Sequence, residues 1–179
     1  PLHSSAASDV YKRQVIGGAL DLITACDMRF ASNDAFFCIQ EINIGMAADV
    51  GTLQRLPKII PDSKMREMAY SGRRMLADEA KDSGLVGEVY ETHDEMMNAV
   101  NKLATEIASK SPVAIYGLKA VMNYSRDHNV NDSLDFNALW SGAMLSQKDM
   151  TEAMTAQMEK RDASFDKMVD IKKFNESKS

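Results

Sequence analysis

The sequence predicts an α/β domain followed by an all-helical region. Three observations support this prediction: short β-rich runs alternate with helical segments over residues 15–111, no strand pattern follows Pro112, and no low-complexity linker separates the two regions. A chain of 179 residues, 45% of them hydrophobic, is long enough for one soluble globular domain or for part of a larger one.

Strands are predicted from short runs rich in β-branched and aromatic residues. They are expected at residues 28–31, 35–39 and 86–90. Helices are predicted from apolar residues at helical spacing and from capping residues, such as Thr92 and Glu95 in a capping box. They are expected at residues 15–26, 52–60, 63–70, 77–82, 92–109, 112–124, 132–145 and 151–161. A loop is expected at residues 41–49, which follow a strand and contain a glycine.

The first fourteen residues show no hydrophobic period and run into an apolar segment without a turn. Residues 1–14 lack the apolar centre of a secretory signal and resemble translated cloning or adapter sequence, so they are excluded from the fold prediction. We expect natural protein to begin near Val15, as a truncated gene product. Its core is expected at residues 15–111 and its helical region at residues 112–179.

Composition excludes several classes of function. A formal charge of -5 argues against a nucleic-acid surface, and no apolar run approaches the roughly 20 residues that span a membrane. Cys26 and Cys38 are interpreted as free thiols among apolar neighbours. The three histidines have no second His or Cys at ligand spacing, so we expect no metal site and no redox cofactor.

Three carboxylates stand among apolar neighbours, at Asp21, Glu41 and Asp49. Acidic side chains are rarely buried without a partner, so each is either a cap, an ion-pair member or loop residue, or a catalytic group. Gly17 and Gly18 precede Asp21, and a glycine N–H at a helix start can donate to a developing oxyanion. The spacing places a carboxylate one helical turn after such a donor, although a lone Gly-Gly pair is a weak indication.

Residues 16–27 (IGGALDLITACD) resemble the signature of the enoyl-CoA hydratase/isomerase, or crotonase, superfamily. Further matching positions are Ala35-Phe36-Phe37, Glu41, Gly45, Gly51, Leu56-Pro57, residues 77–80 (ADEA), residues 84–86 (GLV) and residues 110–112 (KSP). The resemblance implies the C-terminal part of a crotonase-like ββα spiral, followed by an α-helical oligomerisation region. It also implies a homotrimer, or a hexamer of two trimers.

Within the superfamily the sequence most resembles the dienoyl-CoA isomerase branch, which interconverts 3,5-dienoyl and 2,4-dienoyl thioesters in fatty acid β-oxidation. That branch has aspartate at position 21, where hydratases carry glutamate, and it keeps Glu41. It adds Asp49 in the run AADVGTL, which residues 47–53 reproduce in full. The implied substrate is an acyl-CoA thioester, and no further cofactor is implied.

The resemblance also implies a role for each candidate residue. A 3,5 to 2,4 shift removes a proton from C2 and delivers one to C6, and one carboxylate with a reach of about 3 Å does not serve both ends. Glu41 is therefore expected to act as the base at C2 and Asp49 as the acid at C6. Gly18, together with Gly17, is expected to stabilise the thioester oxyanion. Asp21 is expected to be a third, orienting or charge-tuning group.

The sequence departs from the family pattern in two ways. Ala19 stands where the family has a third glycine, a mild change that adds helix propensity. The family's N-terminal half, which supplies the other oxyanion donor and most contacts to coenzyme A, has no counterpart here. We therefore expect the chain by itself to be inactive or poorly active.

Three alternatives stay open. An enoyl-CoA hydratase needs two carboxylates to position a water, and a 3-to-2 enoyl-CoA isomerase needs Glu41 alone. In a different class, the chain is a non-catalytic fragment whose helical end forms an oligomer interface. An intracellular location is expected, in the cytoplasm of a bacterium or in an organelle matrix, and the ending Glu-Ser-Lys-Ser is not the peroxisomal Ser-Lys-Leu.

Overall fold

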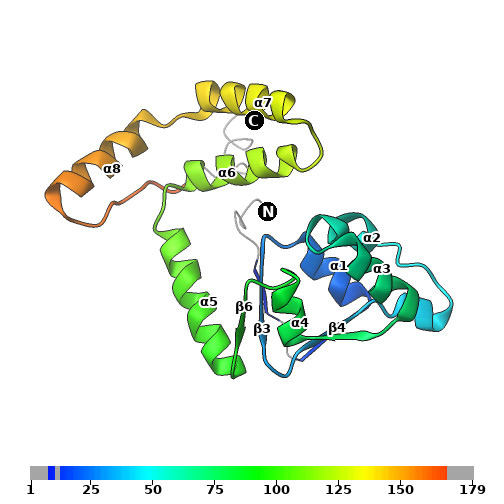
Figure 1. Cartoon of the computed structure of the whole chain (residues 1–179). Helices are drawn as coiled ribbons and strands as arrows, with labels where there is room; N and C mark the ends of the chain where they lie inside the picture. The colour runs from blue at the N-terminus through cyan, green and yellow to red at the C-terminus, as the bar shows by residue number, and fades with distance from the viewer. Residues whose placement is uncertain (1–7, 11–12, 169–179) are drawn as a thin grey trace, which may run out of the picture. The chain divides into compact units, whose positions relative to one another are not determined.

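The computed structural model describes residues 8–10 and 13–168 (Figure 1). The chain divides into two compact units, one with the described residues up to 102 and the other with those from 103. The boundary falls inside helix α5 (His93–Ala108), ahead of the division after residue 111 that the sequence predicts. That predicted division stays a prediction.

Six strands in the first unit form two three-stranded sheets. They are β1 (Ser8–Val10), β2 (Gln14–Ile16), β3 (Met28–Ser32), β4 (Phe36–Cys38), β5 (Arg74–Leu76) and β6 (Glu88–Tyr90). One sheet has the order β1-β3-β6 and is parallel throughout. The other has the order β2-β4-β5, in which β2 and β4 are parallel while β4 and β5 are antiparallel. A parallel pair needs a crossover connection, and helix α1 lies in the one from β2 to β4.

Short helices pack against these sheets and share one core with them. They are α1 (Gly18–Ala25), α2 (Thr52–Arg55), α3 (Asp62–Ser71), α4 (Ala77–Asp82) and the 3₁₀ turns η1 (Glu41–Ile44) and η2 (Leu56–Lys58). The core contains Leu20, Leu56, Met68, Met75 and Leu85, none of which exposes any of its surface. Because these residues come from five separate segments, the core fixes α1, η2 and α3 relative to the β2-β4-β5 sheet.

The expected α/β class is confirmed, and three of the predicted strands occur as β3, β4 and β6. Three strands, β1, β2 and β5, are not predicted. Residues 14–16 form β2 rather than the start of a helix, because Val15 pairs with Phe37 and the helix begins only at Gly18. Arg74–Leu76 forms the short edge strand β5, and the predicted loop begins with the turn η1.

The segment excluded from the fold prediction is partly structured. Ser8–Val10 forms β1 and pairs in parallel with β3, from Met28 to Phe30. The exclusion of these residues from the fold was therefore wrong for Ser8–Val10, since a strand partner supplied by β3 satisfies their backbone groups. Their interpretation as non-natural sequence stays a prediction.

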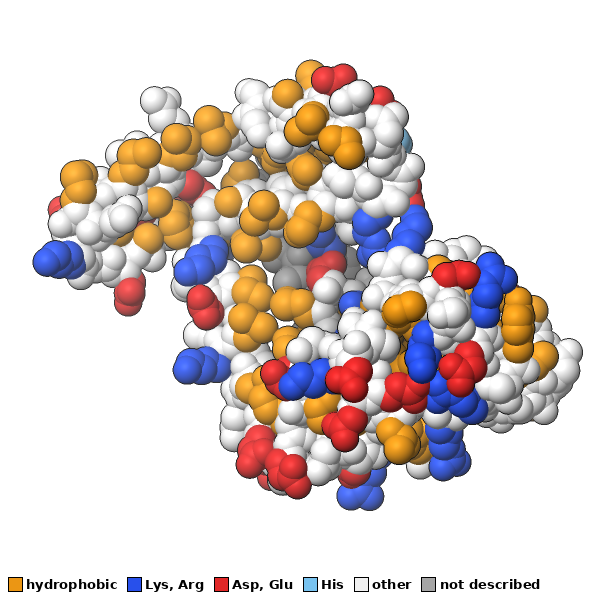
Figure 2. Space-filling view, viewed as in Figure 1, with side chains coloured by type: hydrophobic (Ala, Val, Ile, Leu, Met, Phe, Trp, Pro, Cys, Tyr) orange, Lys and Arg blue, Asp and Glu red, His pale blue; other side chains and the backbone are white. Residues whose placement is uncertain are grey.

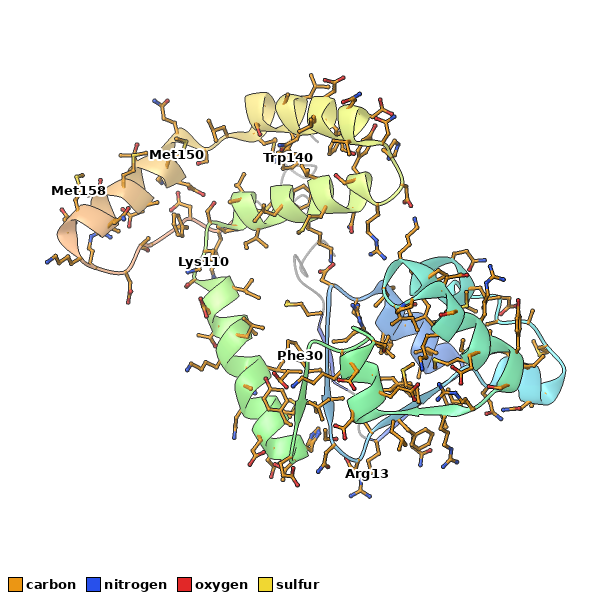
Figure 3. All side chains as sticks on the ribbon, in the orientation of Figure 1. Arg13, Phe30, Lys110, Trp140, Met150 and Met158 are labelled. Carbon is orange, nitrogen blue, oxygen red and sulfur yellow. The ribbon has the colours of Figure 1, made fainter. Side chains whose placement is uncertain are left out.

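The second unit consists of α6 (Pro112–Ser125), α7 (Val130–Met144) and α8 (Gln147–Glu159), together with the end of α5. Trp140 on α7 lies between α7 and α6, with its ring 5.3 Å from that of Tyr116 (Figure 3). Gly117 makes room for it, because a Cβ there would lie 2.2 Å from the indole nitrogen. Ser111 caps α6 and also donates to Asp149 of α8, so this hydrogen bond joins the start of α6 to α8.

The helices of the second unit expose many apolar side chains, visible in orange in Figure 2. Those more than half exposed include Leu118, Met122, Val130, Leu134, Leu139, Leu145, Met154 and Met158. Contiguous exposed apolar surface is uncommon on monomeric soluble proteins. Among the described residues, no helix combines the length and the apolar character that crossing a membrane requires.

Candidate active site

The turn from β2 into α1 carries the two glycines. Gly17 has φ 56° and ψ -122°, a backbone conformation that glycine adopts without a Cβ penalty. Its N–H donates to the carbonyl oxygen of Cys38 on β4 at 3.1 Å, and its carbonyl accepts from Leu20 in the first turn of α1 at 2.7 Å. These bonds fix the turn against the strand next to it, so the direction in which α1 leaves the sheet is set at Gly17.

Gly18 is the first residue of α1. The first N–H groups of a helix have no acceptor within the helix, and they carry the positive end of its dipole. A Cβ at Gly18 would meet no atom within 4 Å, so the space beside this residue is open. An N–H at the start of a helix suits an anionic oxygen.

The Glu41 carboxylate lies directly beside this turn. A Cβ on Gly17 would be 3.0 Å from Oε1 of Glu41, so a glycine at position 17 is what allows the carboxylate to approach. The structure therefore brings together the predicted base and the predicted oxyanion turn, from residues more than twenty positions apart in the sequence.

Backbone hydrogen bonds fix residues 41–45, the Glu41 turn, and so place the main chain that carries this carboxylate. Gly45 ends the turn in the left-handed conformation, with φ 76°, and its N–H bonds to the carbonyls of Glu41 and Ile42. The N–H of Met46 donates to the carbonyl of Glu41 at 2.9 Å. Asn43 anchors the turn to the end of α3 by donating to the Gly72 carbonyl at 3.2 Å.

Asp21 is buried, with 3% of its surface exposed, and its carboxylate has a backbone partner. Its Oδ1 accepts a 2.7 Å hydrogen bond from the N–H of Thr52, the first residue of α2. Asp21 thus caps the neighbouring helix. This contact supports the orienting role among those expected for Asp21, because it ties α1 to the chain that follows Asp49.

Asp49 lies in residues 46–51, the Asp49 segment, between the Glu41 turn and α2. Its side chain is exposed, and among the described residues it makes no hydrogen bond or ion pair. Ala48, next to it, is buried with 6% exposure and packs into the core. The position of the Asp49 carboxylate is therefore set by the backbone of its segment rather than by a side-chain partner.

Arg55 is the residue that sequence reasoning missed. Its guanidinium lies at the junction of α1, the Asp49 segment and α2, and it donates to three acceptors. An arginine inside the helix predicted at residues 52–60 gives no indication of such contacts, because two of the three partners lie more than thirty residues away.

Near the Glu41 turn, the surroundings raise the pKa of the Cys38 thiol. Burial raises the pKa of its thiol, Arg74 partly opposes this, and the negative charge of Glu41 adds to it. The thiol donates to the Gly72 carbonyl at 3.2 Å, so it stays neutral and takes part in packing. Cys26 and Cys38 are both free, and the described residues contain no group of three His, Cys, Asp or Glu suited to a metal ion.

Comparison with known proteins identifies the family. Residues 12–168 match the enoyl-CoA hydratase/isomerase family. The chain is 53% identical over 148 residues to the mouse protein named mitochondrial Delta(3,5)-Delta(2,4)-dienoyl-CoA isomerase, covering 82% of this chain and 45% of the relative. It is 48% identical to the Arabidopsis thaliana peroxisomal protein of the same name, covering 86% of this chain and 55% of the relative. The chain thus spans about half the length of the curated relatives it matches.

Solved structures agree with the sequence comparison. An enoyl-CoA hydratase from Mycobacterium marinum superimposes with a TM-score of 0.83 at 26% identity, covering 89% of this chain and 65% of that one. An enoyl-CoA hydratase from Bacillus anthracis gives 0.81 at 29% identity, covering 85% and 58%. The crotonase-like fold expected from residues 16–27 is confirmed. The chain belongs to the enoyl-CoA hydratase/isomerase family.

Proposed function

We propose that this chain carries the acid–base half of a dienoyl-CoA isomerase site, which converts a 3,5-dienoyl-CoA into its 2,4 isomer. The observation that carries the proposal is the contact between the Glu41 carboxylate and the Gly17 turn, with Asp49 on the next segment of chain. The names of the mouse and Arabidopsis relatives support the same reaction.

The first chemical step is proton removal from C2. Glu41, as a carboxylate, takes this proton while the electron pair of the C–H bond delocalises over C2 to C6 and the thioester oxygen. The oxygen gains negative charge, and the N–H of Gly18, at the positive end of α1, is the donor to that oxygen. The Gly17 turn holds base and donor side by side, which fixes their mutual geometry before substrate binds.

The second step is proton delivery to C6. Asp49, in its acid form, gives a proton to C6, which leaves double bonds at C2–C3 and C4–C5 and a neutral thioester oxygen. Glu41 has then gained one proton and Asp49 has lost one, so solvent must return a proton between them before the next turnover. The exposure of Asp49 favours that exchange.

The hydratase alternative is less well supported by the geometry. A hydratase of this family needs a second carboxylate to position water beside Glu41, and one of the two oxygens of Asp21, Oδ1, already accepts from the N–H of Thr52. The chain is nevertheless 32% identical to a Clostridium acetobutylicum protein named short-chain-enoyl-CoA hydratase, so hydration is a required comparison in the test.

The test supplies the half of the relatives that this chain does not span. Residues 15–179 are fused behind the N-terminal half of the mouse relative, and three rates are measured on matched acyl chains. They are 3,5 to 2,4 isomerisation, followed by the absorbance of the 2,4-dienoyl thioester, 3-to-2 enoyl isomerisation, and hydration of a 2-enoyl-CoA. We expect 3,5 to 2,4 isomerisation to be the fastest of the three. Faster hydration assigns the site to a hydratase, and faster 3-to-2 conversion assigns it to a simple enoyl isomerase.

We also propose that the protein assembles as a homotrimer or as a hexamer of two trimers. The support is the apolar surface on α6 to α8, which nothing within the described part of the second unit covers. Sedimentation velocity of the fused protein tests this directly. A monomer at micromolar concentration contradicts it.

A further inference from the structure

Arg55 links three parts of the chain around the Asp49 segment. It ends α2, and its Nε donates to Oγ1 of Thr24 on α1 at 3.1 Å. One terminal nitrogen donates to two carbonyl oxygens, that of Asp21 on α1 and that of Val50 in the Asp49 segment, each at 2.9 Å. One cation therefore joins α1, α2 and the residue that directly follows Asp49.

Gly51 is the residue that makes this arrangement possible. Its φ of 113° is a conformation that residues with a side chain rarely adopt. A Cβ at this position would lie 2.2 to 2.6 Å from the guanidinium atoms of Arg55, so any side chain would displace the arginine. The glycine is required both by the turn and by the close passage of Arg55.

These contacts bear on Asp49 more than on any other candidate residue. The Asp49 side chain has no partner of its own among the described residues. Its backbone is held by the buried Ala48 on one side and by the Arg55 bond to Val50 on the other. Removing the Arg55 bond leaves one of these two restraints, so the carboxylate becomes free to move.

The base is held independently of Arg55. The main-chain carbonyl of Glu41 accepts from the N–H groups of Gly45 and Met46, which fixes the backbone of the base, and Asn43 ties the turn to Gly72. None of these bonds involves Arg55. Losing the arginine is therefore expected to disturb the acid and to leave the base in place.

We propose that Arg55 is a positioning residue for Asp49, which sets the carboxylate that protonates C6 without touching the substrate. This inference rests on the proposed isomerase function. It predicts that loss of Arg55 slows proton delivery to C6 more than proton removal from C2, whereas loss of a purely structural arginine would slow both steps alike.

The first test measures the restraint itself in this chain, without catalysis. Arg55→Lys keeps the charge but lacks the planar fork that reaches three acceptors. Hydrogen–deuterium exchange of peptides covering residues 46–54 should be at least about five-fold faster than in the unsubstituted chain, with residues 40–45 unchanged. Arg66→Lys is the matched control, because Arg66 lies on α3 and bonds only locally to Asp62 and Tyr70. Unchanged exchange at residues 46–54 in Arg55→Lys overturns the inference.

The second test separates the two proton transfers in the fused protein. In D₂O, deuterium gained at C2 of recovered 3,5-dienoyl-CoA reports the Glu41 step, and appearance of the 2,4 isomer reports the C6 step. A misplacement of about 1 Å can cost about 100-fold in rate. Arg55→Lys should therefore slow isomerisation by roughly 10- to 100-fold while C2 exchange falls by less than about three-fold.

Thr24→Val provides a milder variant in case Arg55→Lys does not fold. It removes one of the three acceptors and keeps the side-chain volume, so isomerisation should fall by about three-fold and C2 exchange should stay unchanged. Equal losses in both reactions, or no loss in either, overturn the inference. If the unsubstituted fused protein does not isomerise a dienoyl-CoA, the proposed function fails, and so does the proposed effect of Arg55 on the reaction. Hydrogen–deuterium exchange of residues 46–54 still decides whether Arg55 holds the Asp49 segment.

Discussion

The Glu41 turn and the Asp49 segment are neighbours in the sequence but are held in opposite ways. Glu41 is half-buried beside Gly17, and backbone hydrogen bonds from Gly45 and Met46 fix its main chain. Asp49 is exposed, and its backbone is held by the burial of Ala48 and by the hydrogen bond from Arg55 to Val50. The proposed base is thus built into a local turn, whereas the proposed acid depends on contacts between helices.

This difference gives the two carboxylates different properties. A base that must meet C2 beside the oxyanion donor needs a fixed distance to that donor, and the Glu41 turn supplies it. An acid that must exchange its proton with solvent between turnovers needs exposure, and the Asp49 segment supplies that. The Asp49 side chain makes no hydrogen bond or ion pair among the described residues, so its position depends on restraints applied to the backbone of its segment.

The largest effect is expected from Glu41→Gln. The amide keeps the shape of the side chain but cannot take the C2 proton, and general-base catalysis contributes about 10²- to 10⁴-fold. Both C2 exchange in D₂O and isomerisation should therefore fall by about 10³-fold in the fused protein. Retention of C2 exchange would show that another group removes the proton, and the comparison between the two carboxylates would fail.

The next largest effect is expected from Gly51→Ala. A Cβ at φ 113° and at 2.2 Å from the Arg55 guanidinium should destabilise the chain by about 2 kcal/mol and displace the arginine. Chemical denaturation measures the first effect, and hydrogen exchange at residues 46–54 measures the second. Gly142→Ala is the control, since a Cβ there meets nothing within 4 Å on a helix, and it should not destabilise the chain. Equal stability of the two variants contradicts the close-passage argument.

A smaller effect is expected from Asp21→Asn. The amide oxygen can still accept from the N–H of Thr52, but the bond loses its charge, which is worth about 1 kcal/mol. Thermal unfolding should show this loss, with exchange faster at the start of α2 than in the Glu41 turn. A loss above about 4 kcal/mol would mean that Asp21 supports the core rather than the cap of α2.

The smallest effect is expected on folding stability when the pH is lowered. Arg73, with help from Lys64, lowers the pKa of Glu79 to about 2, from about 4.5. A lowered folded-state pKa adds stability that is present above pH 4.5 and is lost as the pH falls towards 2. These side chains are about one-third exposed, so the contribution is about 1 kcal/mol or less. Denaturation of Glu79→Gln between pH 7 and pH 2.5 should show a flatter pH profile, while exchange in the Asp49 segment stays the same.

The sequence predicts the candidate site residues better than it predicts the contacts that hold them in place. Gly17, Glu41 and Asp49 lie in short runs whose residue types resemble a family, so they can be identified locally. Arg55 cannot, because its role depends on acceptors on α1 that only the folded chain brings near. The same limit explains the missed strands: Val15 is extended because Phe37 pairs with it, and Arg74–Leu76 is an edge strand too short to show a pattern.

Asp49→Asn decides whether two carboxylates serve the two ends of the dienoyl group. The fused variant is incubated with a 3,5-dienoyl-CoA in D₂O, beside Asp78→Asn, an exposed aspartate of α4, as the matched control. We predict that Asp49→Asn slows isomerisation by about 100-fold while C2 exchange continues at close to the unsubstituted rate. An unchanged isomerisation rate, or equal loss of both reactions, would contradict the division of labour between Glu41 and Asp49.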